Sequence, residues 1–404
     1  MEQVAISMMP ASYGDCFVVA CHDSSSTNIV IDTGFISTYT NYLRSKLLNL
    51  KAAGESLDLL IITHIDADHI SGAIRLLQEN GLYDDPKIIK IKEIWHNSYR
   101  HLQNDNSSVA DIKNSVDRNI IKGIIKRGYP VEIDINKDFG KDIGAEQGSS
   151  LAALIKHGGY SWNRAFDDKA VSIENKCIIN ISEEVKIRLL SPDESKLTNL
   201  KGYWEKELKK MGFKTELDGG EIFDDAFEFL MAYEKTLIPK DFRKNISASK
   251  NDIEDSIGEK FIEDASVTNG SSMAFVLEVK DKKILFLADS HPNLIIKELK
   301  NIYGEGLIWF DAIKISHHGS KGNTSPDLLE IIDSDNFFIS TNGMKFKHPD
   351  LVTLSRIIYR KTKSTRNIIF NYETPISKYL SQEYLEQNYN YKVKVFEHGE
   401  EYHI

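Results

Sequence analysis

The chain contains one dense cluster of metal-ligand side chains, Thr63-His64-Ile65-Asp66-Ala67-Asp68-His69-Ile70-Ser71-Gly72, directly after the apolar run Leu59-Leu60-Ile61-Ile62. Two histidines and two aspartates fall within six positions, a density that surface loops rarely reach. A strand that ends in such a loop brings imidazole and carboxylate ligands to one point, and this donor set suits Zn²⁺ or Mn²⁺. The cluster therefore predicts a metal site at the end of a strand.

The cluster resembles the H-x-[HD]-x-D-H motif of the metallo-β-lactamase fold superfamily. Asp66 stands where most members have a second histidine, which resembles the ComEC-type branch, the metallohydrolase domain of the bacterial competence DNA-uptake channel. Further segments are similar to motifs of that branch and follow in the same order. They are Tyr13-Gly14-Asp15-Cys16 with Ile29-Val30-Ile31-Asp32-Thr33-Gly34, then Ile284-Leu285-Phe286-Leu287-Ala288-Asp289, then Ile313-Lys314-Ile315-Ser316-His317-His318-Gly319-Ser320, and finally Ser340-Thr341-Asn342-Gly343 with His348-Pro349.

The hydrophobic periodicity and the resemblance together predict the fold. The pattern indicates a helix over 39–50, a strand over 57–63, a helix over 70–77, and a hairpin of strands 272–279 and 283–288. Two such β/α halves predict a single αββα sandwich over residues 1–404, with the site at the shared edge of both sheets. The polar stretch 193–265 has weak periodicity, and we expect it to be a partly helical insertion that acts as a lid or partner surface.

Composition restricts the classes of function. The net charge of −10 disfavours a broadly basic nucleic-acid groove. It does not exclude a nuclease, because metal ions would add local positive charge. The runs Lys345-Phe346-Lys347 and Arg360-Lys361-Thr362-Lys363 could also hold phosphate. Three cysteines without C-x-x-C spacing suggest neither a disulfide framework nor a thiolate zinc site.

Localisation is predicted from what the sequence lacks. No apolar run approaches the roughly 20 residues that span a bilayer, and no secretory signal is visible. We therefore expect a free-standing soluble protein in the cytoplasm, without the channel helices of ComEC.

The resemblance implies a centre of two divalent metal ions, Zn²⁺ or Mn²⁺. His64 and Asp66 would hold the first metal, Asp68 and His69 the second, and Asp289 would bridge them. Metals about 3.5–4 Å apart lower the pKa of a bridging water to about 7, which supplies hydroxide at neutral pH. The candidate catalytic residues are Asp68, His318 and His348, the last as a general acid or substrate contact. Asp15, Asp32, Ser320 and Asn323 would support the ligands or contact the substrate.

Two points of the ligand set remain open in the sequence. Adjacent histidines on a strand point to opposite faces, so His317 and His318 would not both reach the metals unless a turn begins between them. The G-H-T-x-G-S histidine of many superfamily members is missing from Thr268-Asn269-Gly270-Ser271-Ser272. The thinner nitrogen shell shifts the preference towards Mn²⁺. His96 is a candidate for the missing ligand, although a strand-end histidine without that role is the commoner case.

Three classes of function fit these features. The first is a binuclear phosphodiesterase, in particular a nuclease acting on DNA, RNA or a nucleotide. The second is a hydrolase of a small molecule such as a cyclic nucleotide, phosphoester or lactone. The third is a metal-stabilised sensor or partner subunit, since proteins resembling this chain often lie beside NTPases in phage-defence loci. A β-lactamase activity is the least expected.

Overall fold

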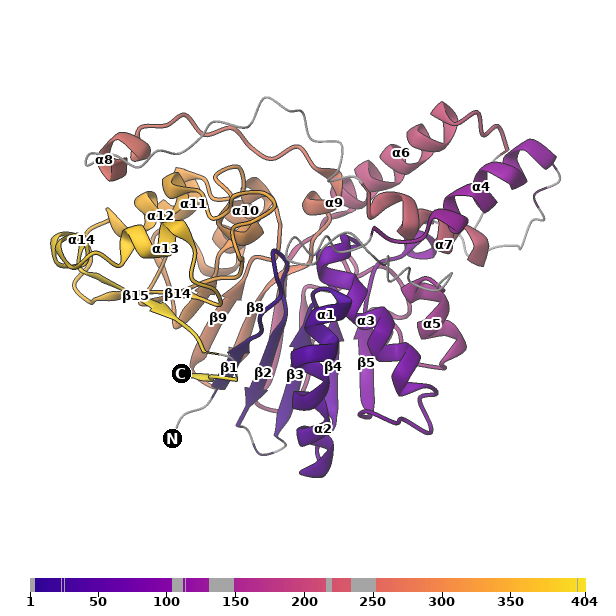
Figure 1. Cartoon of the computed structure of the whole chain (residues 1–404), viewed down its shortest axis with the longest axis horizontal. Helices are drawn as coiled ribbons and strands as arrows, with labels where there is room; N and C mark the ends of the chain where they lie inside the picture. The colour runs from indigo at the N-terminus through magenta and orange to yellow at the C-terminus, as the bar shows by residue number, and fades with distance from the viewer. Residues whose placement is uncertain are drawn as a thin grey trace, which may run out of the picture.

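Two β-sheets packed face to face form the centre of the molecule (Figure 1). The computed structural model describes residues 4–22, 24, 26–103, 112, 114–130, 149–215, 220–233, 252–397 and 399–404. Within these residues the first sheet has six strands, in the order β16 (Tyr402–His403), β1 (Val4–Met8), β2 (Phe17–Cys21), β3 (Thr27–Ile31), β4 (Leu57–Ile61) and β5 (Ile91–Trp95). The second has eight, in the order β15 (Tyr391–Val395), β14 (Arg366–Phe370), β13 (Asn336–Ile339), β11 (Ala312–Lys314), β9 (Lys282–Phe286), β8 (Ala274–Val279), β7 (Val185–Ser191) and β6 (Ile178–Asn180). A separate parallel pair joins β10 (Ile308–Phe310) to β12 (Ile332–Ser334).

The core between the sheets consists of apolar side chains from the facing strands. The ring of Phe17 on β2 lies 5.9 Å from that of Phe286 on β9 and 6.4 Å from that of Phe338 on β13. Val18 and Val30 belong instead to the cluster under the outer helices, because successive side chains of a strand face opposite ways.

Helices cover the outer face of each sheet. The first sheet packs against α2 (Arg44–Ala52), α3 (Ala67–Asn80) and α5 (Leu151–His157). The second packs against α10 (Pro292–Tyr303), α11 (Pro326–Ile331), α12 (Leu351–Ile358), α13 (Pro375–Leu380) and α14 (Glu383–Tyr389). The predicted αββα sandwich is therefore confirmed.

Most predicted elements occur where the periodicity placed them. The helix expected over 39–50 is formed by α1 (Ile36–Thr38), a π-helical turn (Tyr39–Leu43) and α2. The expected hairpin is the antiparallel pair β8–β9. The helix after the metal loop begins at Ala67 rather than at residue 70, because Asp66 has extended backbone angles and takes the N-cap position. Asp68 and His69 therefore lie in the first turn of α3.

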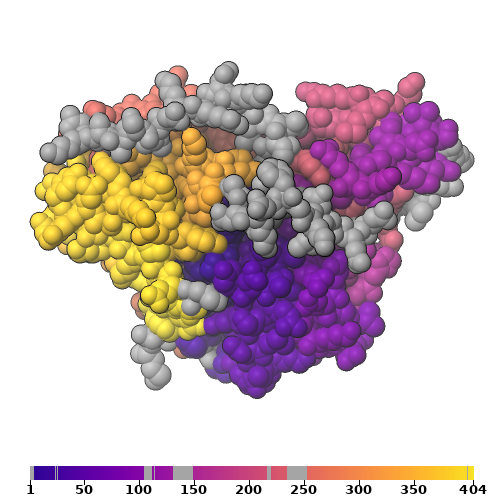
Figure 2. Space-filling view, in the orientation of Figure 1, coloured from indigo at the N-terminus to yellow at the C-terminus, as the bar shows by residue number. Residues whose placement is uncertain are grey.

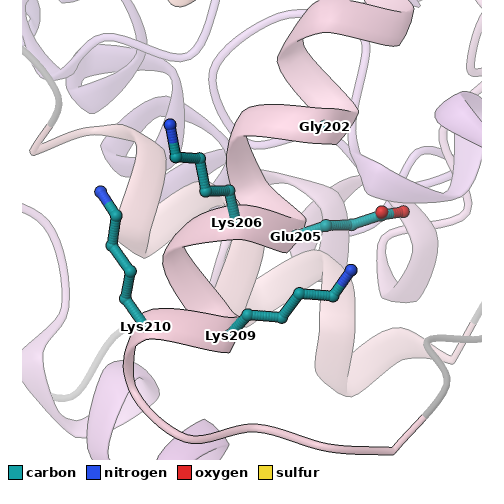
Figure 3. Close-up of a pocket in the computed structure, with 5 residues that line it drawn as sticks. All are labelled: Gly202, Glu205, Lys206, Lys209 and Lys210. Carbon is teal, nitrogen blue, oxygen red and sulfur yellow. The ribbon is translucent and has the colours of Figure 1, made fainter.

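Three helices form an arm beyond β5, visible at the upper right of Figures 1 and 2. The helices α4 (Ser115–Arg127), α6 (Glu194–Lys210) and α7 (Glu221–Met231) share an apolar cluster that contains Trp204, Phe223 and Phe227. The exposed side of α6 carries the shallow hollow of Figure 3, lined by Gly202, Glu205, Lys206, Lys209 and Lys210.

The predicted insertion over 193–265 is partly helical in the parts that the structure describes. It contains α6, α7 and α8 (Asp252–Ile257), whereas residues 216–219 and 234–251 lie outside the described residues. It connects β7 and β8, which are neighbours in the second sheet. No helix among the described residues is both long and apolar enough to cross a lipid bilayer.

Candidate metal centre

The structure brings all seven predicted metal ligands to one edge of the sandwich. They follow the carboxyl ends of β4, β9 and β11 and are each at least nine-tenths buried. The seven are His64, Asp66, Asp68, His69, Asp289, His317 and His318. Parallel strands end at the same edge of a sheet, and β9 and β11 are parallel neighbours, which explains why segments far apart in the sequence meet here.

The carboxylate of Asp289 lies at the centre of this group. Its Oδ2 atom is 3.7 Å from the Nε2 atoms of His64, His69, His317 and His318. One carboxylate oxygen equidistant from four imidazole nitrogens is an arrangement that fits a carboxylate shared between two metal ions. His64, His69 and Asp289 form one cluster compact enough to hold a metal ion.

The two remaining aspartates lie on different sides of this centre. Asp66 Oδ2 is 3.4 Å from His64 Nε2. Asp68 Oδ2 is 3.8 Å from His318 Nε2 and 4.0 Å from His69 Nε2, and these three residues form a second compact cluster. Asp66 thus lies beside His64 and Asp68 beside His69 and His318, whereas His69 belongs to both compact clusters.

Hydrogen bonds fix the orientation of two of the histidine rings. His69 Nδ1 is 2.8 Å from Asp32 Oδ2, and His318 Nδ1 is 2.8 Å from the carbonyl oxygen of Ser340. Each of these oxygens can only accept, so Nδ1 carries the proton and the lone pair of Nε2 faces Asp289. Burial raises the pKa of Asp32 to about 8, but its two oxygens face three donors, from Thr63 N–H, Thr63 O–H and His69, which the ionised form satisfies best.

The other two histidines are oriented in the same way. Thr63 Oγ1 donates to Asp32 and lies 3.0 Å from His64 Nδ1, so it accepts the proton of that nitrogen. His317 Nδ1 is 2.9 Å from Asn323 Oδ1, and the amide nitrogen of Asn323 donates to the backbone oxygen of Asp289. All four rings thus present an unprotonated Nε2 to the centre, which is the form that binds a metal ion.

Both adjacent histidines reach the site, contrary to the expectation for two neighbours on a strand. Strand β11 ends at Lys314, and His317, His318 and Gly319 have φ values of +46°, +56° and +85°. This left-handed turn replaces the alternation of a strand and directs both rings to Asp289. Such strained positions cost of order 1–3 kcal/mol each for non-glycine residues and concentrate at functional sites.

Residues 9–160 match the family model described as the metallo-beta-lactamase superfamily. Over these residues the chain is similar to the metallo-beta-lactamase superfamily. The matched region includes the loop His64–His69 together with Asp15 and Asp32, and the rest of the centre is supplied by residues beyond it. No curated protein matches the sequence.

Two solved structures illustrate the likeness of the chain to known structures, both at low identity. A mutant of the β-hydroxylase CmlA is 10% identical with a TM-score of 0.35, over 100% of this chain and 54% of that one. A long form of RNase Z from yeast is 10% identical with a TM-score of 0.31, over 91% of this chain and 36% of that one. The chain thus spans about half of the first protein and about a third of the second.

Beside the centre lies a buried lysine that the sequence analysis gave no role. Lys314 on β11 is 1% exposed, forms an ion pair with Asp15, donates to the backbone oxygen of Ala288 and lies 4.0 Å from Asp289 Oδ1. Burial raises the pKa of Asp15, but Lys314 and His318 outweigh burial and hold that pKa below its usual range. The sequence pattern that could have indicated this ion pair is a lysine between two isoleucines in an apolar strand, because a buried lysine is almost always paired with a carboxylate.

A carboxylate that the sequence analysis also missed, Asp264, supports His317. Asp264 accepts a hydrogen bond from the side chain of Asn269 and lies 3.6 Å from His317 Nδ1. Burial raises the pKa of Asp264, but these contacts hold it well below its usual range. Asn269 belongs to the segment that lacks the superfamily's usual histidine, and its side chain lies 3.3 Å from His317 Nδ1.

Two further candidates lie elsewhere or have other contacts. His96 is not at the centre: its Nε2 is 2.8 Å from Glu228 in the arm. Arg360 is not available to hold phosphate, because its guanidinium donates to the backbone oxygens of Leu329 and Ile332 and pairs with Asp333.

The remaining candidates lie around His317. The ring of His348 is 5.1 Å from that of His317, and its Nδ1 is 3.3 Å from Asp350. Burial lowers the pKa of His348. Ser320 is buried, and its backbone N–H donates to the carbonyl oxygen of His317.

Proposed function

We propose that this chain is a phosphodiesterase with a binuclear metal centre, related to the ComEC-type branch, that cleaves nucleic acid. The superfamily match supports the coarser class, a metal-dependent hydrolase. The observation that carries the finer proposal is the position of Asp289 Oδ2, 3.7 Å from four histidine Nε2 atoms that are all oriented as acceptors. Aspartates on both sides of this oxygen make the donor set rich in hard ligands.

The residues suggest how two metal ions would be held. His64 and Asp66 would bind the first metal ion, and Asp68, His69 and His318 the second, with Asp289 shared. His317 would complete the first set. It contacts Asn269, and the backbone N–H of Met273, just after that segment, donates to Thr63, beside His64. His317 thus lies beside the segment in which the histidine usual in the superfamily is missing.

The chemistry that this centre supports is hydrolysis of a phosphodiester. Two divalent metal ions bound by these residues would supply Lewis acidity at the phosphoryl oxygens and hydroxide at neutral pH. Carboxylate-rich ligation favours hard cations such as Mn²⁺ over softer ones. Asp32 and Asn323 hold His69 and His317 in the ligand orientation. His348, with Asp350 beside its Nδ1, is the residue we propose to protonate the leaving oxygen.

We also propose that the insertion over 193–265 covers the site as part of one domain with the sandwich. Lys196 on α6 reaches His291, two residues after Asp289, with a distance of 2.8 Å between Nζ and Nδ1. A helix of the insertion therefore contacts the segment that carries the central carboxylate.

The test is cleavage of a panel of substrates with Mn²⁺ or Zn²⁺: single- and double-stranded DNA, RNA, and bis(p-nitrophenyl) phosphate. We expect cleavage by the wild type that is abolished by Asp68→Ala and unchanged by Asp84→Ala, which removes an exposed aspartate outside the centre. Metal-loaded wild type that cleaves none of these substrates would overturn the proposal. Cleavage of the small diester alone would favour a small-molecule hydrolase.

A further inference from the structure

A row of aromatic rings leads outward from the metal centre along the loop between β13 and α12. The ring of His348 lies 5.1 Å from that of His317. The ring of Phe346 lies 6.2 Å from that of His348 at an interplanar angle of 28°, a stacked arrangement. Phe346 is therefore two ring contacts away from a predicted metal ligand.

The inner side of Phe346 is held in place by a small apolar cluster. The edge-to-face contact with Tyr13 has a centroid distance of 5.7 Å and an angle of 87°, and Tyr13 packs in turn on Phe35 at 4.8 Å. The cluster consists of three buried residues, Tyr13, Phe35 and Ala67, and Phe346 packs against it. Ala67 is the first residue of α3 and lies in the metal loop. Edge-to-face pairs of this kind add about 0.5–1.5 kcal/mol beyond the area they bury, so the ring position is well defined.

The outer side of the same loop combines apolar surface with positive charge. Phe346 is only half-buried, and the neighbouring Met344 is 51% exposed. Lys345 Nζ lies 5.0 Å from the centre of the Phe346 ring and 4.7 Å from that of Tyr13, within cation–π range. Lys347 is exposed on the same loop. This loop therefore places an aromatic ring and two cations beside the centre of buried carboxylates.

We propose that Phe346 stacks against a nucleobase adjacent to the scissile phosphate, with Lys345 and Lys347 beside the flanking phosphates. Aromatic side chains interleaved with cations are the usual means by which proteins bind single-stranded nucleic acids, since every base has a π-face and every linkage a negative charge. The proposal rests on the proposed phosphodiesterase function and narrows its substrate to a diester that carries an unpaired base. It gives the acidic protein a local recognition element that its net charge does not indicate.

The test is direct binding, which does not depend on turnover. A short single-stranded oligonucleotide containing 2-aminopurine is titrated with protein in Ca²⁺, a hard cation for oxygen-rich sites. We expect quenching of 2-aminopurine fluorescence on binding, because the base stacks. Stacking contributes about 1–3 kcal/mol per base, so Phe346→Leu should raise Kd by roughly 5- to 150-fold. Phe346→Trp should restore both the affinity and the quenching. An oligonucleotide with an abasic residue at the stacking position should bind Phe346→Leu and the wild type with the same Kd.

The matched control is Tyr384→Leu, which removes another partly exposed aromatic ring (43% exposed) on α14. It should leave Kd unchanged. Three results would each overturn the proposal. They are 2-aminopurine fluorescence that the wild type leaves unquenched, a Kd that Phe346→Leu leaves unchanged, and a loss of affinity in Phe346→Leu that is as large for the abasic oligonucleotide as for the intact one. A quenching, Phe346-dependent complex that is never cleaved would leave base stacking standing while the phosphodiesterase function fails. Comparing a mononucleotide with the oligonucleotide separates recognition of a free nucleotide from recognition of a strand.

Discussion

Replacing Gly14 by alanine should displace the metal loop. Gly14 lies in the turn between β1 and β2, and a Cβ atom there would be 1.9 Å from the backbone oxygen of Asp68. Carbon–oxygen contacts of this kind are ordinarily about 3.3–3.6 Å long, so the two segments must separate by more than about 1 Å. The first turn of α3 is held from its other side, because the backbone oxygen of His69 accepts from Thr33 N–H. We expect a loss of about 1–3 kcal/mol in the free energy of unfolding, the usual cost of overpacking.

The displaced loop should also bind metal ions more weakly. A displacement of about 1 Å in a catalytic group costs roughly 100-fold in rate, and Asp68 is a proposed ligand. The assay is isothermal titration with Mn²⁺ alongside thermal unfolding of the metal-free protein. The matched control is Gly202→Ala on the exposed side of α6, where an added Cβ would meet no atom within 4 Å. That control should bind metal as the wild type does and gain about 0.5–1 kcal/mol, as expected for alanine in place of glycine in a helix. Gly14→Ala with the metal affinity of the wild type would refute this reasoning.

Three further changes test the supporting contacts. Asp32→Asn removes the carboxylate that holds His69 and should lower metal affinity by about 10–100-fold, measured by competition with a chelating dye; unchanged affinity would count against this role. Lys314→Met leaves Asp15 buried without its ammonium partner and should cost about 3–5 kcal/mol in chemical denaturation, whereas a cost below 1 kcal/mol would show that the ion pair is dispensable. Burial raises the pKa of Glu228, but His96 and the hydrogen bonds that Glu228 accepts outweigh burial and hold that pKa below its usual value. The stability that ionised Glu228 contributes is therefore present above the usual glutamate pKa and is lost as the pH falls through the lowered pKa. Stability measured from pH 7 down to pH 3 should therefore fall less steeply for Glu228→Gln than for the wild type, and parallel curves would contradict this.

Local patterns in the sequence, together with the resemblance to the metallo-β-lactamase fold, predicted the sandwich and the segments that carry most site residues. Each ligand motif follows an apolar run, and a short apolar run ending in polar residues is a strong indicator of a strand end. The loop His64–His69 and Asp289 could be placed at one edge because strands in both halves of the fold end there.

Contacts between distant segments could not be predicted in this way. The turn that directs both His317 and His318 inward depends on left-handed backbone angles, which the alternation rule for strands does not anticipate. Asp264 lies in a polar stretch without periodicity, so nothing local indicated that it faces His317. The arm was underestimated because the apolar side chains of α6, such as Trp204, are spread along a helix dominated by lysine and glutamate.

The account depends most directly on the number and position of bound metal ions. Crystals grown with Mn²⁺ should show two anomalous peaks, one on each side of the Asp289 carboxylate and about 3.5–4 Å apart. The peak on the side of Asp66 should contact His64 and His317, and the other should contact Asp68. A single peak, or two peaks that do not share Asp289, would contradict the proposed centre.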